Sequence, residues 1–124
     1  MFTIAKEIRF SAAHTIRGHT GGCERLHGHN YRVRVVLEAE ELDELGMVMD
    51  FADLKGMLEE ITAPLDHRLL NEVAPFDRIN TTAELISRHV FEEIARRLPA
   101  ERGLRVERVE VWEGPSSFAA YRPS

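Results

Sequence analysis

The segment from residue 27 to residue 40 restricts the possible folds more than any other part of the chain. From position 31 onward, the odd-numbered residues are apolar or aromatic and the even-numbered ones are mostly charged. Tyr31, Val33, Val35, Leu37 and Ala39 alternate with Arg32, Arg34, Val36, Glu38 and Glu40. Successive side chains of a strand point to opposite faces of its sheet. The alternation therefore predicts a strand with one buried face, and residues 2–13 predict a second such strand, with Lys6 as the exception.

Three histidines fall on the predicted buried faces of these two strands. His27 and His29 are two residues apart, so both imidazoles leave an extended strand from the same side. His14 follows the first strand at a spacing of two residues from Ala12 and four from Phe10, so its side chain is expected on the same face as theirs. If the strands are neighbours with their apolar faces aligned, the three imidazoles meet near one end of the sheet. Such a set with an open fourth position is typical of catalytic zinc, which we expect here. The alternative is one core histidine and two surface histidines.

The composition is that of a soluble protein with a single domain spanning residues 1–124, with 44% hydrophobic and 30% charged residues. Its 16 basic and 21 acidic residues give a formal net charge of -5, which argues against a nucleic-acid-binding surface. No apolar run approaches the ~20 residues of a membrane span. A single cysteine, Cys23, excludes an internal disulfide and predicts a cytoplasmic location. A lone cysteine beside several histidines is also a candidate catalytic thiol.

An amphipathic helix is predicted directly after the acidic turn that follows the second strand. Asp50 is a typical N-cap residue, and the helix runs from about Phe51 to Thr62, before Pro64. Its apolar residues are spaced to form one stripe: Phe51, Leu54, Leu58 and Ile61. We expect this stripe to pack on the sheet.

A second helix is predicted from near Asn80 to about Leu98. Thr81 and Glu84 occupy the positions of a capping box at its start. His89 lies on its apolar stripe, where a packed histidine at the edge of the core is more common than a metal ligand. We therefore leave His89 out of the candidate metal site.

Two later segments, residues 106–113 and 118–121, complete the predicted sheet. The order strand, strand, helix, helix, strand, strand predicts an α+β fold, a four-stranded antiparallel sheet with two helices covering one face. Such a sheet has free edges and one uncovered face. Oligomerisation that joins sheets edge to edge into a barrel would remove the edges.

Several short motifs that span nearly the whole chain recur together, in this order, in one protein family. They are Phe10-Ser-Ala-Ala-His14, Cys23-x-x-x-His27-Gly-His29-Asn30, Met49-Asp50-Phe51-x-x-Leu54-Lys55, Leu65-Asp66-His67 followed by Leu69 and Asn71, Thr82-Ala83-Glu84, and Glu113. On these residues the chain resembles the 6-pyruvoyltetrahydropterin synthase family, which includes the 6-carboxytetrahydropterin synthases of queuosine biosynthesis. The three-residue link between Cys23 and His27 resembles the 6-carboxy branch. The resemblance implies the ββααββ tunnelling fold, assembled as trimers or hexamers with pockets at subunit junctions.

The resemblance also implies a reaction, in which 7,8-dihydroneopterin triphosphate becomes 6-carboxy-5,6,7,8-tetrahydropterin with loss of triphosphate and acetaldehyde. Zinc on the three histidines would polarise the side-chain oxygens of the substrate. Cys23 would be the base that removes a carbon-bound proton, activated by the nearby positive charge. His67, oriented by Asp66, would be the partner acid–base group. Neighbours on a regular strand point apart, so this pairing requires an irregular backbone.

Further positions are implied to recognise the substrate. Glu113 would bind the guanidine-like edge of the pterin through two hydrogen bonds. Thr82 and Glu84 resemble additional pterin-pocket positions, although helix capping accounts for this region equally well. The triphosphate must meet positive charge, for which the sequence offers Arg17, His19, Arg25, Lys55 and Arg68.

Three other functions stay open on the sequence alone. A 6-pyruvoyltetrahydropterin synthase would eliminate triphosphate without cleaving the substrate side chain. A non-catalytic zinc-binding assembly module of the same fold would be expected to lack Cys23, Asp66 or His67, and this chain has all three. A generic zinc hydrolase needs a carboxylate base near its metal ligands, for which Glu24 is the nearby candidate.

Overall fold

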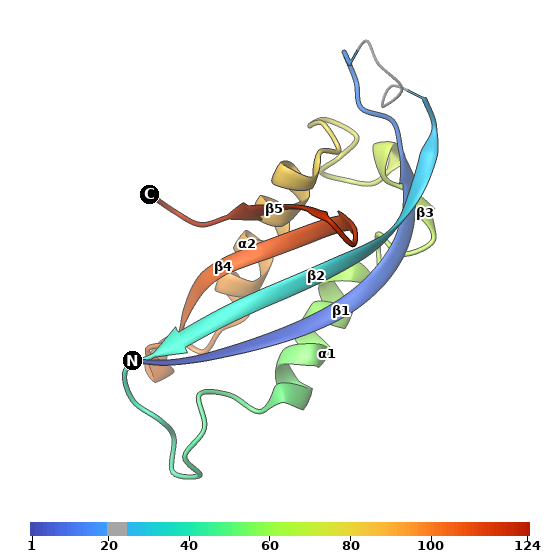
Figure 1. The fold of residues 1–124 in the computed structure, drawn as a ribbon. Coiled ribbons are helices and arrows are strands. Elements are labelled where there is room, and N and C mark those ends of the chain that lie inside the picture. Colours follow the sequence, from blue (N-terminus) through green and yellow to red (C-terminus); the bar gives the residue numbers. More distant parts are fainter. Residues whose placement is uncertain (20–24) are drawn as a thin grey trace.

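The structure is a computed structural model that describes residues 1–19 and 25–124. Its elements are, in chain order, β1 (Phe2–His14), β2 (His27–Ala39), α1 (Phe51–Thr62), β3 (Arg68–Leu69), the 3-10 helix η2 (Leu70–Glu72), α2 (Ala83–Arg97), the 3-10 helix η3 (Ala100–Arg102), β4 (Arg105–Gly114) and β5 (Ser117–Tyr121). They form an α+β fold with both α-helices on the same face of one sheet (Figure 1). No helix in these ranges is long and apolar enough to cross a membrane.

The sheet has five strands in the order β3-β1-β2-β4-β5, one more than the sequence predicts. The four longer strands are antiparallel to their neighbours, as expected, whereas β3 runs parallel to β1. This extra strand contains only Arg68 and Leu69, which pair with Ala12 and Ala13. Two residues are too few to show an alternation, so the prediction of a four-stranded, fully antiparallel sheet was wrong at this edge.

β1 and β2 pair along their whole length, and their register decides where the histidines lie. Phe10 is opposite Tyr31, and the two rings stack with their centroids 5.0 Å apart. The same face continues to the pair His14–His27 at the end of the ladder, with His29 beside it. The predicted alignment of the two apolar faces is confirmed, and it brings all three histidines to one end of the sheet.

The helices cover the face of the sheet that carries the histidines. Between them lies a core of fully buried side chains from two strands and both helices: Tyr31, Val33, Val35, Leu37, Leu54, Leu58, Ile86, Val90, Ile94, Val109 and Val111. Burying one aliphatic or aromatic side chain contributes roughly 1.5–3 kcal/mol. This packing therefore fixes the strands whose ends carry the site.

The start of α2 differs from its prediction. Thr82 is the N-cap, and its hydroxyl accepts a hydrogen bond from the Leu85 N–H at 3.2 Å. Thr81 is buried, and its hydroxyl donates to the Thr15 carbonyl at 2.9 Å. The capping box predicted from Thr81 and Glu84 is therefore wrong. The Thr81 hydroxyl is used in a tertiary hydrogen bond, and Thr82 caps the helix.

The other helix predictions are confirmed. The Asp50 carboxylate accepts a hydrogen bond from the Ala52 N–H at 2.7 Å, which makes it the N-cap of α1. His89 packs edge-on against Phe76, with ring centroids 5.4 Å apart. It is a packed residue at the edge of the core and lies outside the histidine group described below.

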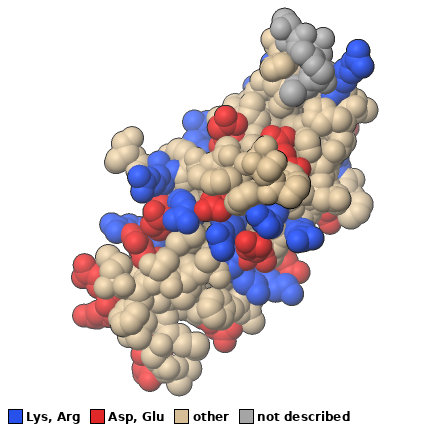
Figure 2. Space-filling model, viewed as in Figure 1, with Lys and Arg blue, Asp and Glu red and all other residues tan. Residues whose placement is uncertain are grey.

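The opposite face of the sheet carries acidic and basic side chains side by side (Figure 2). Arg108 Nε donates to Glu110 Oε2 at 2.8 Å. The Arg32 guanidinium lies over the Trp112 ring, 4.2 Å from its centroid. A barrel made from several sheets would enclose this face, and that assembly stays a prediction.

Candidate metal centre

The three histidines at the end of the β1–β2 ladder form a compact group. One ring nitrogen from each of His14, His27 and His29 lies within 4.8 Å of the other two. His14 Nε2 is 3.0 Å from His27 Nε2. His14 is fully buried, whereas the other two rings are partly exposed. The predicted clustering is confirmed, and the three side chains are close enough to hold a metal ion.

Backbone carbonyls determine which nitrogen carries the proton in two of these imidazoles. His14 Nδ1 is 2.8 Å from the Thr81 carbonyl oxygen, and His27 Nδ1 is 2.6 Å from that of Arg25. A carbonyl oxygen only accepts, so each Nδ1 donates and each Nε2 of a neutral ring keeps its lone pair. These two lone pairs face each other at 3.0 Å. The contact is repulsive between neutral rings and favourable around a shared cation, so the geometry fits metal ligation.

His29 and the carboxylate of Glu113 complete the polar surroundings. His29 Nε2 is buried and makes no hydrogen bond of acceptable geometry within the described residues. It nevertheless lies 2.9 Å from Glu113 Oε2, which is also 3.7 Å from His14 Nε2. A buried nitrogen without a partner is costly, and a nearby carboxylate stabilises positive charge. Both observations fit a cation held by the three histidines.

Burial keeps His14 in the form that binds a metal. Desolvation is the main cause that lowers the pKa of His14, and the Thr81 carbonyl offsets it only in part. A metal-bound imidazole must be neutral, so a lowered pKa favours ligation at neutral pH. The Tyr31 hydroxyl lies 3.2 Å from His14 Nδ1, and burial raises the pKa of this phenol, which stays protonated. Three imidazole nitrogens with a partly exposed side fit the ligand set of a catalytic zinc site.

Asp66 and His67 form a second polar group. Asp66 Oδ1 is 3.0 Å from His67 Nδ1. Adjacent side chains can meet here because His67 has a positive φ of 59°, which interrupts the alternation of an extended chain. The Ser11 N–H donates to the same Asp66 oxygen at 2.9 Å and is the main cause that lowers the pKa of this carboxyl. The irregular backbone that the pairing requires is present.

The Asp66–His67 pair lies apart from the three clustered histidines. The His67 side chain is 81% exposed and lines a hollow of about 510 Å³ together with His29, Ser11 and Asn30. Ser11 and Asn30 pair on the face of the β1–β2 ladder opposite to the imidazole of His29, because side chains alternate along both strands. No hydrogen bond, ion pair or ring contact joins His67 to a clustered histidine in residues 1–19 and 25–124.

The other predicted site residues are placed differently. Thr82 caps α2 and Glu84 is exposed in its first turn, and neither side chain makes a hydrogen bond or ion pair with the clustered histidines within the described ranges. Cys23 lies outside the described residues. Sequence reasoning missed the Thr81 carbonyl and the Tyr31 hydroxyl. The parity of Tyr31 on β2 would have indicated its position, whereas a backbone carbonyl leaves no signal in a sequence.

One basic residue considered for phosphate binding, Arg17, also has a structural role. The Arg17 guanidinium donates to the carbonyl oxygens of Phe76 and Ile79 at 2.8 and 2.9 Å. These contacts engage the cation in holding a loop. Arg68 is exposed and lines the hollow beside His67, where its charge is accessible to a ligand.

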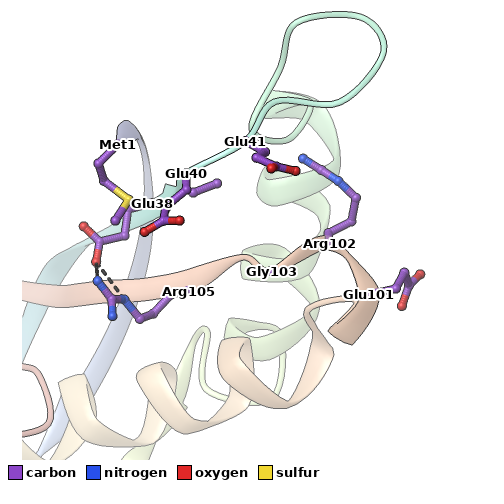
Figure 3. A pocket seen from close by; sticks show the side chains of 9 residues that line it. Met1, Glu38, Glu40, Glu41, Glu101, Arg102, Gly103 and Arg105 are labelled. Carbon is purple, nitrogen blue, oxygen red and sulfur yellow. Dashed lines mark hydrogen bonds and ion pairs between the residues drawn. The ribbon is translucent and has the colours of Figure 1, made fainter.

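A separate hollow of about 360 Å³ lies at the far end of the sheet (Figure 3). Its Arg105 contacts Glu38, and its Arg102 donates to the Val48 carbonyl at 3.0 Å. Ala39, which also lines it, is at the end of the β1–β2 ladder opposite to the histidines. This hollow is therefore distinct from the candidate metal centre.

Comparison with known proteins places this geometry in a family. The sequence model described as 6-pyruvoyl tetrahydropterin synthase matches residues 3–124. A putative 6-carboxy-5,6,7,8-tetrahydropterin synthase of Archaeoglobus fulgidus is 43% identical over 113 residues, which cover 91% of this chain and 89% of the relative. Other curated relatives named 6-carboxy-5,6,7,8-tetrahydropterin synthase are 30–38% identical.

Two further relatives have other names. A dihydroneopterin monophosphate aldolase of Pyrococcus furiosus is 36% identical over 105 residues, 85% of this chain and 83% of the relative. The structure of Caenorhabditis elegans 6-pyruvoyl tetrahydropterin synthase matches with a TM-score of 0.86 at 28% identity, covering 99% of this chain and 96% of the other. The match of the family model to nearly every residue shows that this chain belongs to the 6-pyruvoyl tetrahydropterin synthase family.

Proposed function

We propose that this protein is a zinc-dependent 6-carboxytetrahydropterin synthase. It converts 7,8-dihydroneopterin triphosphate and one water to 6-carboxy-5,6,7,8-tetrahydropterin, acetaldehyde and triphosphate. The observation that carries the proposal is the cluster of His14, His27 and His29 in a chain whose curated relatives at 30–43% identity include many synthases of this name. A three-nitrogen site with a partly exposed side suits chemistry on the oxygens of a bound substrate.

The clustered histidines hold and orient the metal. When bound, zinc supplies Lewis acidity to the side-chain oxygens of the substrate. The carbonyls of Thr81 and Arg25 hold His14 and His27 with Nε2 directed into the cluster. Burial of His14 keeps water away from the helix side of the centre, so the substrate approaches from the exposed side of His29.

Proton transfer is assigned to residues that do not ligate the metal. Cys23 takes the carbon-bound proton, and His67 exchanges protons with the substrate. The lowered pKa of Asp66 keeps it charged, so it accepts from His67 Nδ1–H and leaves His67 Nε2 for the substrate. The pair lies apart from the metal ligands within one chain, which supports a complete site assembled at a subunit junction of a homo-oligomer.

Recognition of the pterin is assigned to Glu113, with Thr82 and Glu84 as further candidates. The Glu113 carboxylate lies at the exposed side of the metal centre, 2.9 Å from His29 Nε2. Binding the pterin edge requires this carboxylate to turn from the imidazole toward the substrate. The Thr82 hydroxyl accepts a hydrogen bond as the α2 cap, and its own proton stays available to donate to a ligand.

Turnover of 7,8-dihydroneopterin triphosphate by the zinc-loaded protein is expected to release one acetaldehyde for each pterin consumed. The reason is that the 6-carboxy route cleaves the side chain, whereas triphosphate loss is common to both branches. The aldehyde is measured by coupling to alcohol dehydrogenase, and the pterin product is identified by its mass. Pterin turnover without aldehyde would contradict the proposal and indicate the 6-pyruvoyl reaction.

An aldolase is the second candidate function, and the Pyrococcus furiosus relative at 36% identity favours it. Retro-aldol cleavage breaks a carbon–carbon bond of the side chain while the phosphate ester stays intact. It therefore releases a phosphorylated two-carbon aldehyde and no free triphosphate. Mass spectrometry of the trapped aldehyde separates this outcome from acetaldehyde in the same reaction mixture.

A further inference from the structure

The segment that follows His14 is held by side-chain amides in place of a neighbouring strand. Asn71 Oδ1 accepts from the Thr15 N–H at 2.9 Å, and its Nδ2 donates to the Thr15 carbonyl at 3.0 Å. Asn80 makes the same pair of bonds with the N–H and carbonyl of Arg17, both at 3.0 Å. A carboxamide carries the same donor and acceptor as a peptide group. The two asparagines therefore act as a strand edge beyond the end of β1.

Further bonds tie the same two parts of the chain together. The buried Thr81 hydroxyl donates to the Thr15 carbonyl at 2.9 Å. From the other side, the Arg17 guanidinium donates to the Phe76 carbonyl at 2.8 Å. Residues 15–17 and the loop from residue 71 to residue 81 are thus held together by side chains that each segment contributes to the backbone of the other. Opening this arrangement would remove the protein partners of the Thr15 and Arg17 N–H groups, which favours the closed form.

Asn80 also holds Thr81, the residue whose carbonyl contacts His14. Its Oδ1 accepts a second hydrogen bond, from the Thr81 N–H, at 3.0 Å. The carbonyl of Thr81 then accepts from His14 Nδ1 at 2.8 Å. Asn80 therefore fixes Thr81 relative to Arg17, while Asn71 fixes Thr15, the residue directly after His14.

We propose that Asn71 and Asn80 are positioning residues that set the tautomer and orientation of His14 through the Thr81 carbonyl. With this carbonyl in place, the proton is on Nδ1 and the Nε2 lone pair is available to a metal. The Tyr31 hydroxyl, 3.2 Å from the same Nδ1, is the competing partner. If the carbonyl withdraws, this hydroxyl donates to Nδ1, the proton moves to Nε2, and ligation is blocked. The loss of zinc affinity rests on the proposed function, whereas the tautomer is a property of the metal-free chain.

The first test uses metal-free protein with isotopically labelled histidine nitrogens. Nuclear magnetic resonance at about pH 8, above the ordinary imidazole pKa, distinguishes the Nδ1–H from the Nε2–H tautomer. Wild-type His14 is expected to be Nδ1–H, and Asn80→Ala is expected to populate Nε2–H. Asp43→Ala is the matched control, because it removes a side chain that accepts from Leu45 N–H and Met47 N–H in a distant turn, both at 2.9 Å. It should leave the His14 signals as in wild type.

The second test measures zinc affinity by competition with a chromophoric chelator. Losing a partner of a metal-bound imidazole typically weakens binding 10–100-fold, so Asn80→Ala is expected to weaken it by about tenfold or more. The Asp43→Ala control should stay within about twofold of wild type. Asn80→Asp keeps the Oδ1 acceptor for both N–H groups and serves if the alanine variant does not fold. Its affinity is expected between those of wild type and Asn80→Ala.

The outcomes separate positioning from simple loop anchoring. An unchanged His14 tautomer in Asn71→Ala and Asn80→Ala, with a melting temperature lowered as in Asp43→Ala, would overturn the inference. A wild-type protein without zinc affinity would contradict the proposed function. In that case the tautomer comparison still decides whether the asparagines position His14.

Discussion

His14→Ala is expected to weaken zinc binding by at least about 100-fold, beyond the effect typical of losing only a partner of a ligand. The variant keeps two imidazoles, His27 and His29, which are too few for a stable site on their own. His14 is also the most buried of the three, so its loss opens the closed side of the centre. Zinc per chain after dialysis, together with chelator competition, gives the affinity directly.

Two variants keep this result interpretable. His29→Ala removes a partly exposed ligand and should lose zinc to a similar degree without leaving a large cavity in the core. His89→Gln removes a histidine that packs against Phe76 outside the cluster, and it should retain wild-type zinc. Full zinc occupancy in His14→Ala would remove His14 from the site.

Cys23→Ala is expected to lower kcat by about 10²–10⁴-fold, the range typical of losing a positioned acid or base. It should retain one zinc per chain, since the thiolate is assigned as base and not as ligand. The measurement pairs steady-state kinetics with metal analysis of the same sample. Because KM reports binding more than proton transfer, we expect a smaller change in KM than in kcat.

Cys23→Ser is the matched control for this prediction. It keeps the size of the side chain but replaces a thiol with an ordinary pKa of about 8.5 by a far weaker acid, so it should be nearly as inactive as Cys23→Ala. A Cys23→Ala protein that loses its zinc would contradict the assignment, since the cysteine would then be a ligand. Wild-type turnover in Cys23→Ala would instead remove the cysteine from the mechanism.

The placement of the histidines was predictable because strand alternation is a geometric rule. Tyr31, Val33 and Val35 define one face of β2, and that parity extends to His27 and His29. The same parity in β1 ends at His14, so aligning two apolar faces was enough to bring the three rings together. One face had to be buried, and a slip of one residue would have exposed it.

The features that were missed depend on single backbone groups or on tertiary contacts. The short strand β3 is too brief to show a pattern. The expected pairing of Asp66 with His67 required an irregular backbone but did not predict that it is a positive φ at His67. Thr81 and Thr82 are equally good caps by sequence. Only the folded chain shows that the Thr81 hydroxyl donates to the Thr15 carbonyl, while the Thr82 hydroxyl caps the helix.

X-ray absorption spectroscopy at the zinc edge of the reconstituted protein tests the central claim most directly. The account predicts three imidazole nitrogens and one oxygen at about 2.0–2.2 Å from zinc, and no sulfur. A sulfur scatterer at about 2.3 Å would show that Cys23 ligates the metal and would contradict its assignment as the base.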